Sequence, residues 1–163
     1  MPSCPEGHAS AADDYCDVCG SVIATPRKTV WIATITADRG FYERVLARGG
    51  PDTVDFPEFF PERRIRLRDR ALIGRSHRNQ GVEPDIDLGI APADRGVSTQ
   101  HAVLRVRETG LTITDLGSTN GTSLNQADEL LVNGEETPLQ DGDRIHVGAW
   151  TTITVTRSDE ETP

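Results

Sequence analysis

The residues with the clearest capacity for chemistry are cationic, hydroxyl and amide side chains in four short stretches, three of which contain glycine. The stretches are Gly74-Arg75-Ser76, Ser98-Thr99-Gln100-His101, Asp115-Leu116-Gly117-Ser118-Thr119-Asn120-Gly121-Thr122 and Val132-Asn133-Gly134. The guanidinium of Arg75 is planar and can hold two oxygens of one phosphate group, and the hydroxyls of Ser98 and Thr119 can donate to the others. A phosphorylated side chain carries nearly two negative charges and three acceptor oxygens. A receptor for such an anion needs a fixed cation with neutral hydrogen-bond donors around it.

Short strands are expected to position these stretches. The predicted strands are Val30–Thr36, Arg64–Arg68, Ala71–Gly74, Asp85–Leu88, His101–Arg107, Leu111–Asp115, Thr122–Leu124, Leu130–Val132, Thr137–Pro138, Asp143–Val147 and Thr151–Arg157. In Arg64–Arg68, polar and apolar residues alternate, which places Ile65 and Leu67 inward. Asn133-Gly134 and Asp141-Gly142 are hairpin signals between such runs. Many short strands at close spacing predict an all-β, two-sheet sandwich.

One short helix is expected between the first two strands. Phe41, Val45 and Leu46 recur at helical spacing between Asp38 and Gly50, and Asp38 can cap the start. The glycines at 49 and 50 can end the helix, and the proline-rich residues 51–62 predict an irregular loop. The sandwich is therefore expected to carry an inserted helix and loop.

The N-terminal residues predict a separate metal site. Cys4, His8, Cys16 and Cys19 follow the pattern C-x3-H-x7-C-x2-C. An odd number of cysteines is a poor disulfide framework, whereas three thiolates and one imidazole suit the tetrahedral coordination of structural zinc. The segment is similar to a single zinc-ribbon knuckle, in which His8 stands where a second cysteine is usual. Because so short a fragment cannot bury a core, zinc is expected to supply its folding energy.

Composition limits the classes of function. The net charge is −9, which argues against a general nucleic-acid binder, although arginines are concentrated between Arg63 and Arg78. No apolar run is long enough to suggest a membrane span, and the first residues lack the features of a secretory signal. We therefore expect a cytoplasmic protein.

In this order, the four stretches resemble the forkhead-associated (FHA) family, whose pattern is G-R, S-x-x-H and a later N-G. The resemblance covers about residues 29–157 and implies a two-sheet FHA sandwich that binds phosphothreonine in partner proteins, without enzymatic activity. It implies that Arg75, Ser98 and Thr119 contact the phosphate, with Thr99 as an added contact, and that Asn120 binds the main chain of the peptide. It also implies structural roles for the remaining matched residues, which are Gly74, His101 and Gly121.

The cysteine pattern, the polar ends and the resemblance together predict how the chain is divided, and the resemblance implies what it binds. The predicted parts are a zinc-ribbon-like knuckle at 1–20, a linker at 21–28, the FHA domain at 29–157 and a flexible tail at 158–163. The implied partners are phosphothreonine proteins of a Ser/Thr kinase system. In such sandwiches the first and last strands are neighbours, so Trp31 and Trp150 are expected to lie near each other.

Three alternatives are open to test. A hydrolase built on Ser98, His101 and Asp115 is disfavoured, because a spacing of three along a strand places Ser98 and His101 on opposite faces. A nucleic-acid role would join the zinc knuckle to the Arg63–Arg78 stripe. A regulatory role would have Thr162 in the tail become phosphorylated and occupy the protein's own site.

Overall fold

The computed structural model describes residues 28–47, 55–76, 81, 83–127 and 129–160. One compact unit runs from Val30 to Ser158, and the second unit, Met1–Thr29 with Asp159–Pro163, lies almost wholly outside the described residues. The predicted zinc ligands Cys4, His8, Cys16 and Cys19, together with Thr162 of the tail, also lie outside them. The predicted boundaries of the knuckle, linker, FHA domain and tail stay predictions.

The described chain consists mostly of short strands. In chain order the elements are β1 (Lys28–Ala37), α1 (Arg39–Ala47), β2 (Arg63–Leu67), β3 (Arg70–Gly74), β4 (Ile86–Asp87), β5 (Gln100–Arg107), β6 (Gly110–Asp115), β7 (Thr122–Leu124), β8 (Thr137–Leu139), β9 (Arg144–Val147) and β10 (Thr151–Glu160). No helix among the described residues is long and apolar enough to cross a membrane.

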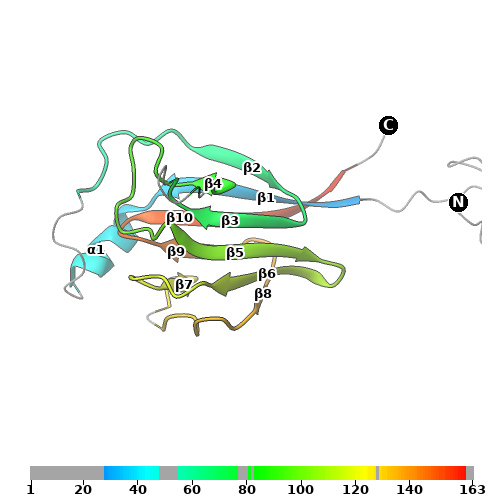
Figure 1. Ribbon diagram of the computed structural model, residues 1–163. Coiled ribbons are helices and arrows are strands. Elements are labelled where there is room, and N and C mark those ends of the chain that lie inside the picture. Colours follow the sequence, from blue (N-terminus) through cyan, green and yellow to red (C-terminus); the bar gives the residue numbers. More distant parts are fainter. Residues whose placement is uncertain (1–27, 48–54, 77–80, 82, 128, 161–163) are drawn as a thin grey trace, which may run out of the picture. The chain divides into compact units, whose positions relative to one another are not determined.

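The strands form two sheets of five, in the orders β2-β1-β10-β9-β7 and β4-β3-β5-β6-β8. Neighbours pair in antiparallel fashion except β3 and β4, which are parallel. Figure 1 shows the two sheets, with α1 at one end of the strands. The prediction of an all-β, two-sheet sandwich with an inserted helix is confirmed.

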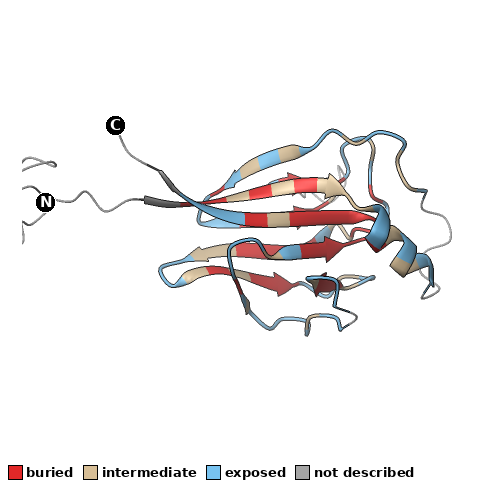
Figure 2. Ribbon diagram, turned by 180° about the vertical axis from the view of Figure 1, so that it is seen from behind, coloured by how far each residue is buried: buried red, intermediate tan, exposed pale blue. Residues whose placement is uncertain are grey.

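Alternation along the strands produces the core. In β2, Leu67 is buried and Ile65 half-buried, whereas Arg64 and Arg66 are exposed, as the sequence predicts. The buried positions include Ala102 and Leu104 of β5, which pack in one apolar cluster with residues of the other sheet. Figure 2 shows that the buried residues lie on the strands of both sheets. Burial of apolar surface between the sheets therefore stabilises the sandwich.

Helix α1 and the loop after it pack on the turn between β9 and β10. Asp38 caps the helix, because its Oδ1 accepts a hydrogen bond of 3.1 Å from the backbone N–H of Phe41. The rings of Phe56 and Phe60 meet Trp150 edge-on, with centroid distances of 6.4 and 5.3 Å. The insertion between β1 and β2 is thus anchored to the sandwich by an aromatic cluster.

Three local expectations are wrong. Leu130–Val132 forms no strand. Asn133-Gly134 and Asp141-Gly142 are turns, with φ of +81° and +88° at their glycines, but they do not join neighbouring strands of one sheet. Both pairs of residues form turns, as the sequence predicts. Which strands pair depends on contacts between the sheets, which the local sequence does not specify.

The pairing of the first and last strands is confirmed, because β1 and β10 are neighbours. Trp31 and Trp150 nevertheless belong to different apolar clusters. The backbone N–H of Asp38 donates to the carbonyl of Trp150, whereas the carbonyl of Ile32 accepts from Thr156. The two tryptophans therefore lie toward opposite ends of this strand pair.

Candidate phosphate-binding end of the sandwich

Strand directions bring three predicted stretches to one end of the sandwich. The antiparallel register of β3, β5 and β6 places the end of β3, the start of β5 and the end of β6 at the same edge. Arg75 follows β3, Ser98 precedes β5, and Thr119 lies in the loop after β6. Residues more than twenty positions apart in sequence thereby become neighbours.

Arg75 is held against the loop that precedes β5. Its backbone N–H donates to the carbonyl of Thr99 at 3.2 Å, and its Nε donates to the carbonyl of Val97 in a short hydrogen bond. No hydrogen bond or ion pair joins its two terminal nitrogens to another described residue. The guanidinium is therefore oriented by its inner nitrogen, while its outer edge is available for an anion.

Gly74 permits this close approach. A Cβ at this position would lie 2.0 Å from the carbonyl oxygen of Thr99 and 2.8 Å from its carbon. These are backbone atoms, which cannot swing aside as the end of a side chain can. Glycine is thus required at this position for β3 to lie against the Ser98-Thr99 backbone.

His101 is buried and braces the loop that carries Ser98. Its Nδ1 accepts a hydrogen bond of 3.1 Å from the backbone N–H of Ser98, and its Nε2 lies 3.0 Å from the carbonyl of Gly121. A neutral ring with its proton on Nε2 satisfies both contacts. Burial is the main cause that lowers the pKa of His101, although the contact with Gly121 acts in the opposite direction. The ring therefore links two loops and is kept neutral.

Ser98 and Thr119 connect the same two loops at the surface. The hydroxyl of Ser98 accepts a hydrogen bond of 3.0 Å from the backbone N–H of Thr119 and lies 3.5 Å from the Thr119 hydroxyl. Asn120 points its amide nitrogen at the carbonyl of Gly96, at 2.8 Å. The Ser98 and Thr119 hydroxyls and the Asn120 amide thus lie together on these two loops, whereas Thr99 contributes its backbone carbonyl, which accepts the N–H of Arg75.

Asp115 shapes the loop of Thr119 and Asn120. Its Oδ1 accepts the backbone N–H groups of Gly117 and Ser118, and its Oδ2 accepts the hydroxyls of Ser118 and Thr122, both at 2.6 Å. Burial by itself raises the pKa of Asp115, but these hydrogen bonds outweigh burial, so the pKa is lowered. The carboxylate is ionised and committed to the loop.

These contacts do not assemble a Ser–His–Asp triad. His101 contacts the backbone of Ser98 and not its hydroxyl, and Asp115 contacts Ser118 and Thr122. The expectation that Ser98 and His101 lie on opposite faces of one strand is wrong, because Ser98 precedes β5 and the chain turns back over the ring. Neither ring nitrogen of His101 is directed at the hydroxyl that it would have to activate.

Two further aspartates position the site, and the sequence analysis overlooked them. Asp94 is fully buried and accepts hydrogen bonds from the backbone of Gly96, Ala149 and Trp150 and from the hydroxyl of Thr151. Asp87 accepts the backbone N–H groups of Ser76 and Gly89. Asp94 therefore ties the Ser98 loop to the β9–β10 turn, and Asp87 fixes the residue after Arg75.

A repeated sequence signal could have revealed these aspartates. Asp87-Leu88-Gly89, Asp94-Arg95-Gly96 and Asp115-Leu116-Gly117 are all Asp-x-Gly, and in each the aspartate accepts the glycine N–H, at 2.8, 2.9 and 2.8 Å. Aspartate typically bonds its own backbone two residues on, which stabilises a turn. The same short pattern therefore supports the loops on which Arg75, Ser98 and Thr119 depend.

Much of the arginine-rich stretch lies away from this end. Arg64 and Arg66 project from the exposed side of edge strand β2, and Arg78 lies outside the described residues. Arg63 is the exception, because its Nη1 donates to the carbonyl of Asp87 at 2.8 Å. The structure thus brings together Arg75, Ser98, Thr119 and Asn120 but not the predicted stripe as a whole.

Comparison with known proteins finds FHA domains. The family model described as FHA domain matches residues 71–148. The chain is similar to the solved structure of the Rv0020c FHA domain, at 25% identity and a TM-score of 0.50, over 80% of this chain and 95% of that one. No curated protein matches the chain.

Two more distant solved structures share the fold. The FHA domain of a hypothetical protein from Arabidopsis thaliana is 21% identical with a TM-score of 0.55, over 84% of this chain and 92% of that one. Full-length yeast Pml1p is 21% identical with a TM-score of 0.56, over 93% of this chain and 99% of that one. The fold of the described sandwich is therefore the FHA fold, and residues 71–148 match the family model described as FHA domain.

Proposed function

We propose that the FHA domain at residues 71–148 makes this protein a reader of phosphothreonine in partner proteins, without catalytic activity. The single observation that carries the proposal is the approach of Arg75, Ser98 and Thr119 at one end of the sandwich. FHA domains are among the modules that recognise phosphorylated motifs through arginine. A fixed cation with hydroxyl donors around it meets the needs of a phosphate dianion.

Each group has a distinct part in the proposed complex. The terminal nitrogens of Arg75 donate to phosphate oxygens, and the hydroxyls of Ser98 and Thr119 donate to the remaining ones. The hydroxyl of Ser98 accepts the N–H of Thr119, and its own proton, which donates to the Thr119 hydroxyl over a long 3.5 Å, can turn toward the ligand instead. Thr99 provides an added contact in this proposal.

Asn120 is proposed to fix the peptide backbone. Its amide nitrogen is occupied by the carbonyl of Gly96, which orients its Oδ1 outward. An amide oxygen held in this way can accept one backbone N–H of an extended peptide. The residue therefore aligns the peptide, and the phosphate supplies most of the affinity.

The expected strength is moderate. Hydrogen bonds to charged groups are worth about 1.5–3 kcal/mol each. Several of them, less the cost of desolvation and peptide ordering, correspond to a dissociation constant of about 1 μM. Because most of this energy depends on the phosphate, a kinase and a phosphatase can switch the complex. The partners are accordingly proposed to be cytoplasmic phosphothreonine proteins of a Ser/Thr kinase system.

The test is binding of matched peptides that differ only in phosphorylation of one threonine. The phosphorylated peptide is expected to bind, and Arg75→Ala is expected to weaken it by about tenfold or more. Arg70→Ala removes another exposed arginine, from the start of β3, and serves as the control. Equal binding of the two peptides contradicts the proposal. Tight binding of unmodified RNA or DNA that survives Arg75→Ala would favour the nucleic-acid alternative.

We also propose that the N-terminal segment binds one structural zinc ion through Cys4, His8, Cys16 and Cys19. The support is the donor set and its spacing in the sequence, since thiolates and imidazole suit tetrahedral zinc. None of these four residues is among those proposed to bind the phosphopeptide.

A further inference from the structure

An open groove of about 270 Å³ lies on the side of the domain between β7 and β8. Its apolar lining comes from Leu124, Leu130, Leu131 and Val132. Leu131 is half-buried and packs against the core, whereas Leu130 and Val132 are 48% and 64% exposed. The apolar residues that predicted a strand thus line a groove whose outer part faces solvent.

The groove adjoins the loop that carries Thr119 and Asn120. The side chain of Leu130 lies so close to Gly121 that a Cβ on this glycine would be 2.6 Å from it. The backbone N–H of Leu131 donates to the carbonyl of Thr122, and that of Gly134 donates to the carbonyl of Asp115. The groove wall is therefore bonded to both ends of this loop.

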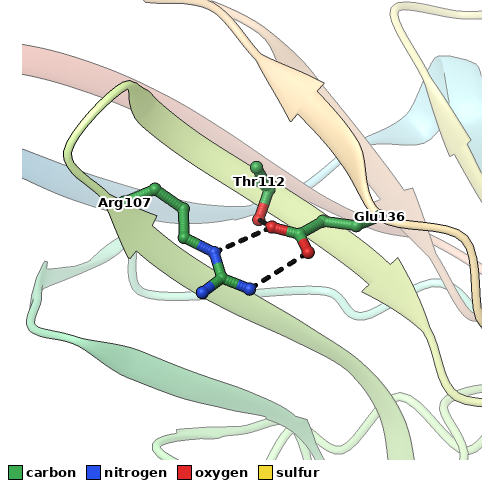
Figure 3. A network of polar contacts seen from close by, with 3 residues as sticks. All are labelled: Arg107, Thr112 and Glu136. Atoms are coloured by element: carbon green, nitrogen blue, oxygen red, sulfur yellow. Dashed lines mark hydrogen bonds and ion pairs between the residues drawn. The ribbon is translucent and has the colours of Figure 1, made fainter.

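The rim of the groove is acidic. Glu129 and Glu135 line it, both are exposed, and neither forms an ion pair with another residue that the structure describes. The adjacent Glu136 is engaged elsewhere: Arg107 contacts both of its oxygens at 2.9 and 3.0 Å, and Thr112 donates to it at 2.7 Å (Figure 3). The hydrogen bond from Arg107 is the main cause that lowers the pKa of Glu136. Among the described residues that line the groove, the carboxylates that can attract a ligand at the rim are those of Glu129 and Glu135.

We propose that this groove binds a second segment of the same phosphorylated partner, in which aliphatic side chains are flanked by lysine or arginine. The inference rests on the proposed function for the identity of its partner. Leu130 and Val132 contact the aliphatic side chains, and the carboxylates of Glu129 and Glu135 attract the flanking cations. Because the phosphate site and the groove share one loop, engaging both at once converts the second contact into an intramolecular one. Selectivity among phosphothreonine proteins then comes from the basic, aliphatic segment.

The first experiment compares extensions of one phosphothreonine peptide by fluorescence polarisation. The core peptide is extended on either side through a Gly-Ser spacer by Lys-Leu-Leu-Lys, Glu-Leu-Leu-Glu or Lys-Ser-Ser-Lys. On one side, the Lys-Leu-Leu-Lys extension is expected to tighten binding about tenfold, since withdrawing one leucine from water is worth roughly this factor. The other two extensions are expected to have less than about a twofold effect, because each lacks one of the two required features. If none of the extensions tightens binding, the proposal is overturned.

Variants of the rim and lining test where the gain arises. Val132→Asp is expected to abolish the gain while leaving the core peptide unaffected, because this exposed side chain lies outside the phosphate site. The double variant Glu129→Lys with Glu135→Lys is expected to transfer the preference to Glu-Leu-Leu-Glu. Glu43→Lys with Glu108→Lys changes two exposed glutamates elsewhere and serves as the matched control. A gain that survives both groove variants contradicts the proposal.

A further measurement separates failure of the groove from failure of phosphothreonine binding. If the core peptide does not bind, the proposed function fails, and the unphosphorylated Lys-Leu-Leu-Lys peptide is titrated into ¹⁵N-labelled protein. Shifts of the amide signals of Leu130–Val132 that disappear in Val132→Asp still support the groove. Unchanged signals in this segment overturn it.

Discussion

The hydroxyl oxygen of Ser98 lies 3.0 Å from the backbone nitrogen of Thr119, so two loops meet before any phosphate is bound. Beneath this contact, His101 bonds the backbone of Ser98 on one side and that of Gly121 on the other. The two loops are therefore bridged twice, once at the surface and once in the interior. A site bridged in this way loses little conformational freedom when it binds a ligand, which favours affinity.

Substitutions of Thr119 are expected to weaken phosphopeptide binding when they remove its hydroxyl group. Thr119→Ser retains the hydroxyl and should bind a phosphothreonine peptide within about threefold of the unaltered protein. Thr119→Val removes the hydroxyl at similar shape and should weaken binding by about tenfold or more, since a hydrogen bond to a charged group is lost. Isothermal calorimetry measures the series. Equal affinities for the serine and valine variants would exclude Thr119 as a phosphate ligand.

Gly74→Ala is expected to damage both stability and binding. The added Cβ would overlap the carbonyl oxygen of Thr99, so β3 and the Ser98 loop must separate. We expect a loss of about 1–3 kcal/mol in the free energy of unfolding, typical of forced overpacking, together with weaker phosphopeptide binding. Gly40→Ala lies in α1, where alanine is the better helix former, and its added Cβ would meet only side-chain atoms, the nearest being the Oδ1 of Asp38 at 3.3 Å, so it is the control expected to destabilise much less. Urea unfolding measures both variants, and equal stabilities would contradict the close approach.

Asp94→Asn is expected to be strongly destabilising, although it changes little in size. The carboxylate accepts hydrogen bonds from Gly96, Ala149, Trp150 and Thr151, and an amide would direct N–H groups at some of these donors. We expect a loss of about 3 kcal/mol or more, as for other buried hydrogen-bonded charges. Asp69→Asn, an exposed aspartate between β2 and β3, is the control. Unfolding can be followed by tryptophan fluorescence because Trp150 is buried beside Asp94.

The stability of the domain is expected to fall as the pH drops below about 6.5, the usual pKa of histidine. Burial lowers the pKa of His101 in the folded state, so the unfolded chain takes up this proton at a higher pH than the folded one. The stability that neutral His101 contributes is present above the unfolded pKa and is lost as the pH falls through the folded one. Denaturant unfolding of the peptide-free protein between pH 7.5 and about 4.5 measures the effect.

His101→Gln provides the comparison for this pH dependence. Glutamine keeps a donor and an acceptor but does not titrate. The variant should therefore be less stable at neutral pH, and its free energy of unfolding should change less between pH 7.5 and about 4.5. The buried His146 is left unaltered in both proteins and cancels in the difference. If the free energy of unfolding depends on pH equally in His101→Gln and in the unaltered protein, another group causes the effect.

Removal of zinc is expected to leave phosphothreonine binding intact. One equivalent of zinc should be released by chelation or by Cys16→Ser with Cys19→Ser, because the proposed tetrahedral site loses half of its ligands. Elemental analysis and phosphopeptide affinity are measured on the same samples. An absence of zinc from the freshly purified protein would contradict the metal site.

The sequence by itself determined the class of fold and the residue types of the site. The period-two alternation predicted for Arg64–Arg68 is present in β2. The apolar face of a strand is set by its own sequence, so it can be predicted locally. Asp38 caps α1 for the same reason, since its acceptor lies three residues from the donor in Phe41. Arg75, Ser98 and Thr119 were identified from short patterns of residues, which also depend on local sequence.

Only the tertiary structure decided how these local pieces combine. Leu130–Val132 has the composition of a strand but forms none, because pairing requires a partner edge that the local sequence does not specify. Asp94 belongs to an Asp-x-Gly pattern, which is typical of a local turn, but it also bonds to a turn more than fifty residues away, between Ala149 and Thr151. The groove beside Gly121 likewise exists only because Leu130 returns to the loop after β6. Such long-range contacts are fixed by packing of the two sheets, and they turn separate patterns into one candidate site.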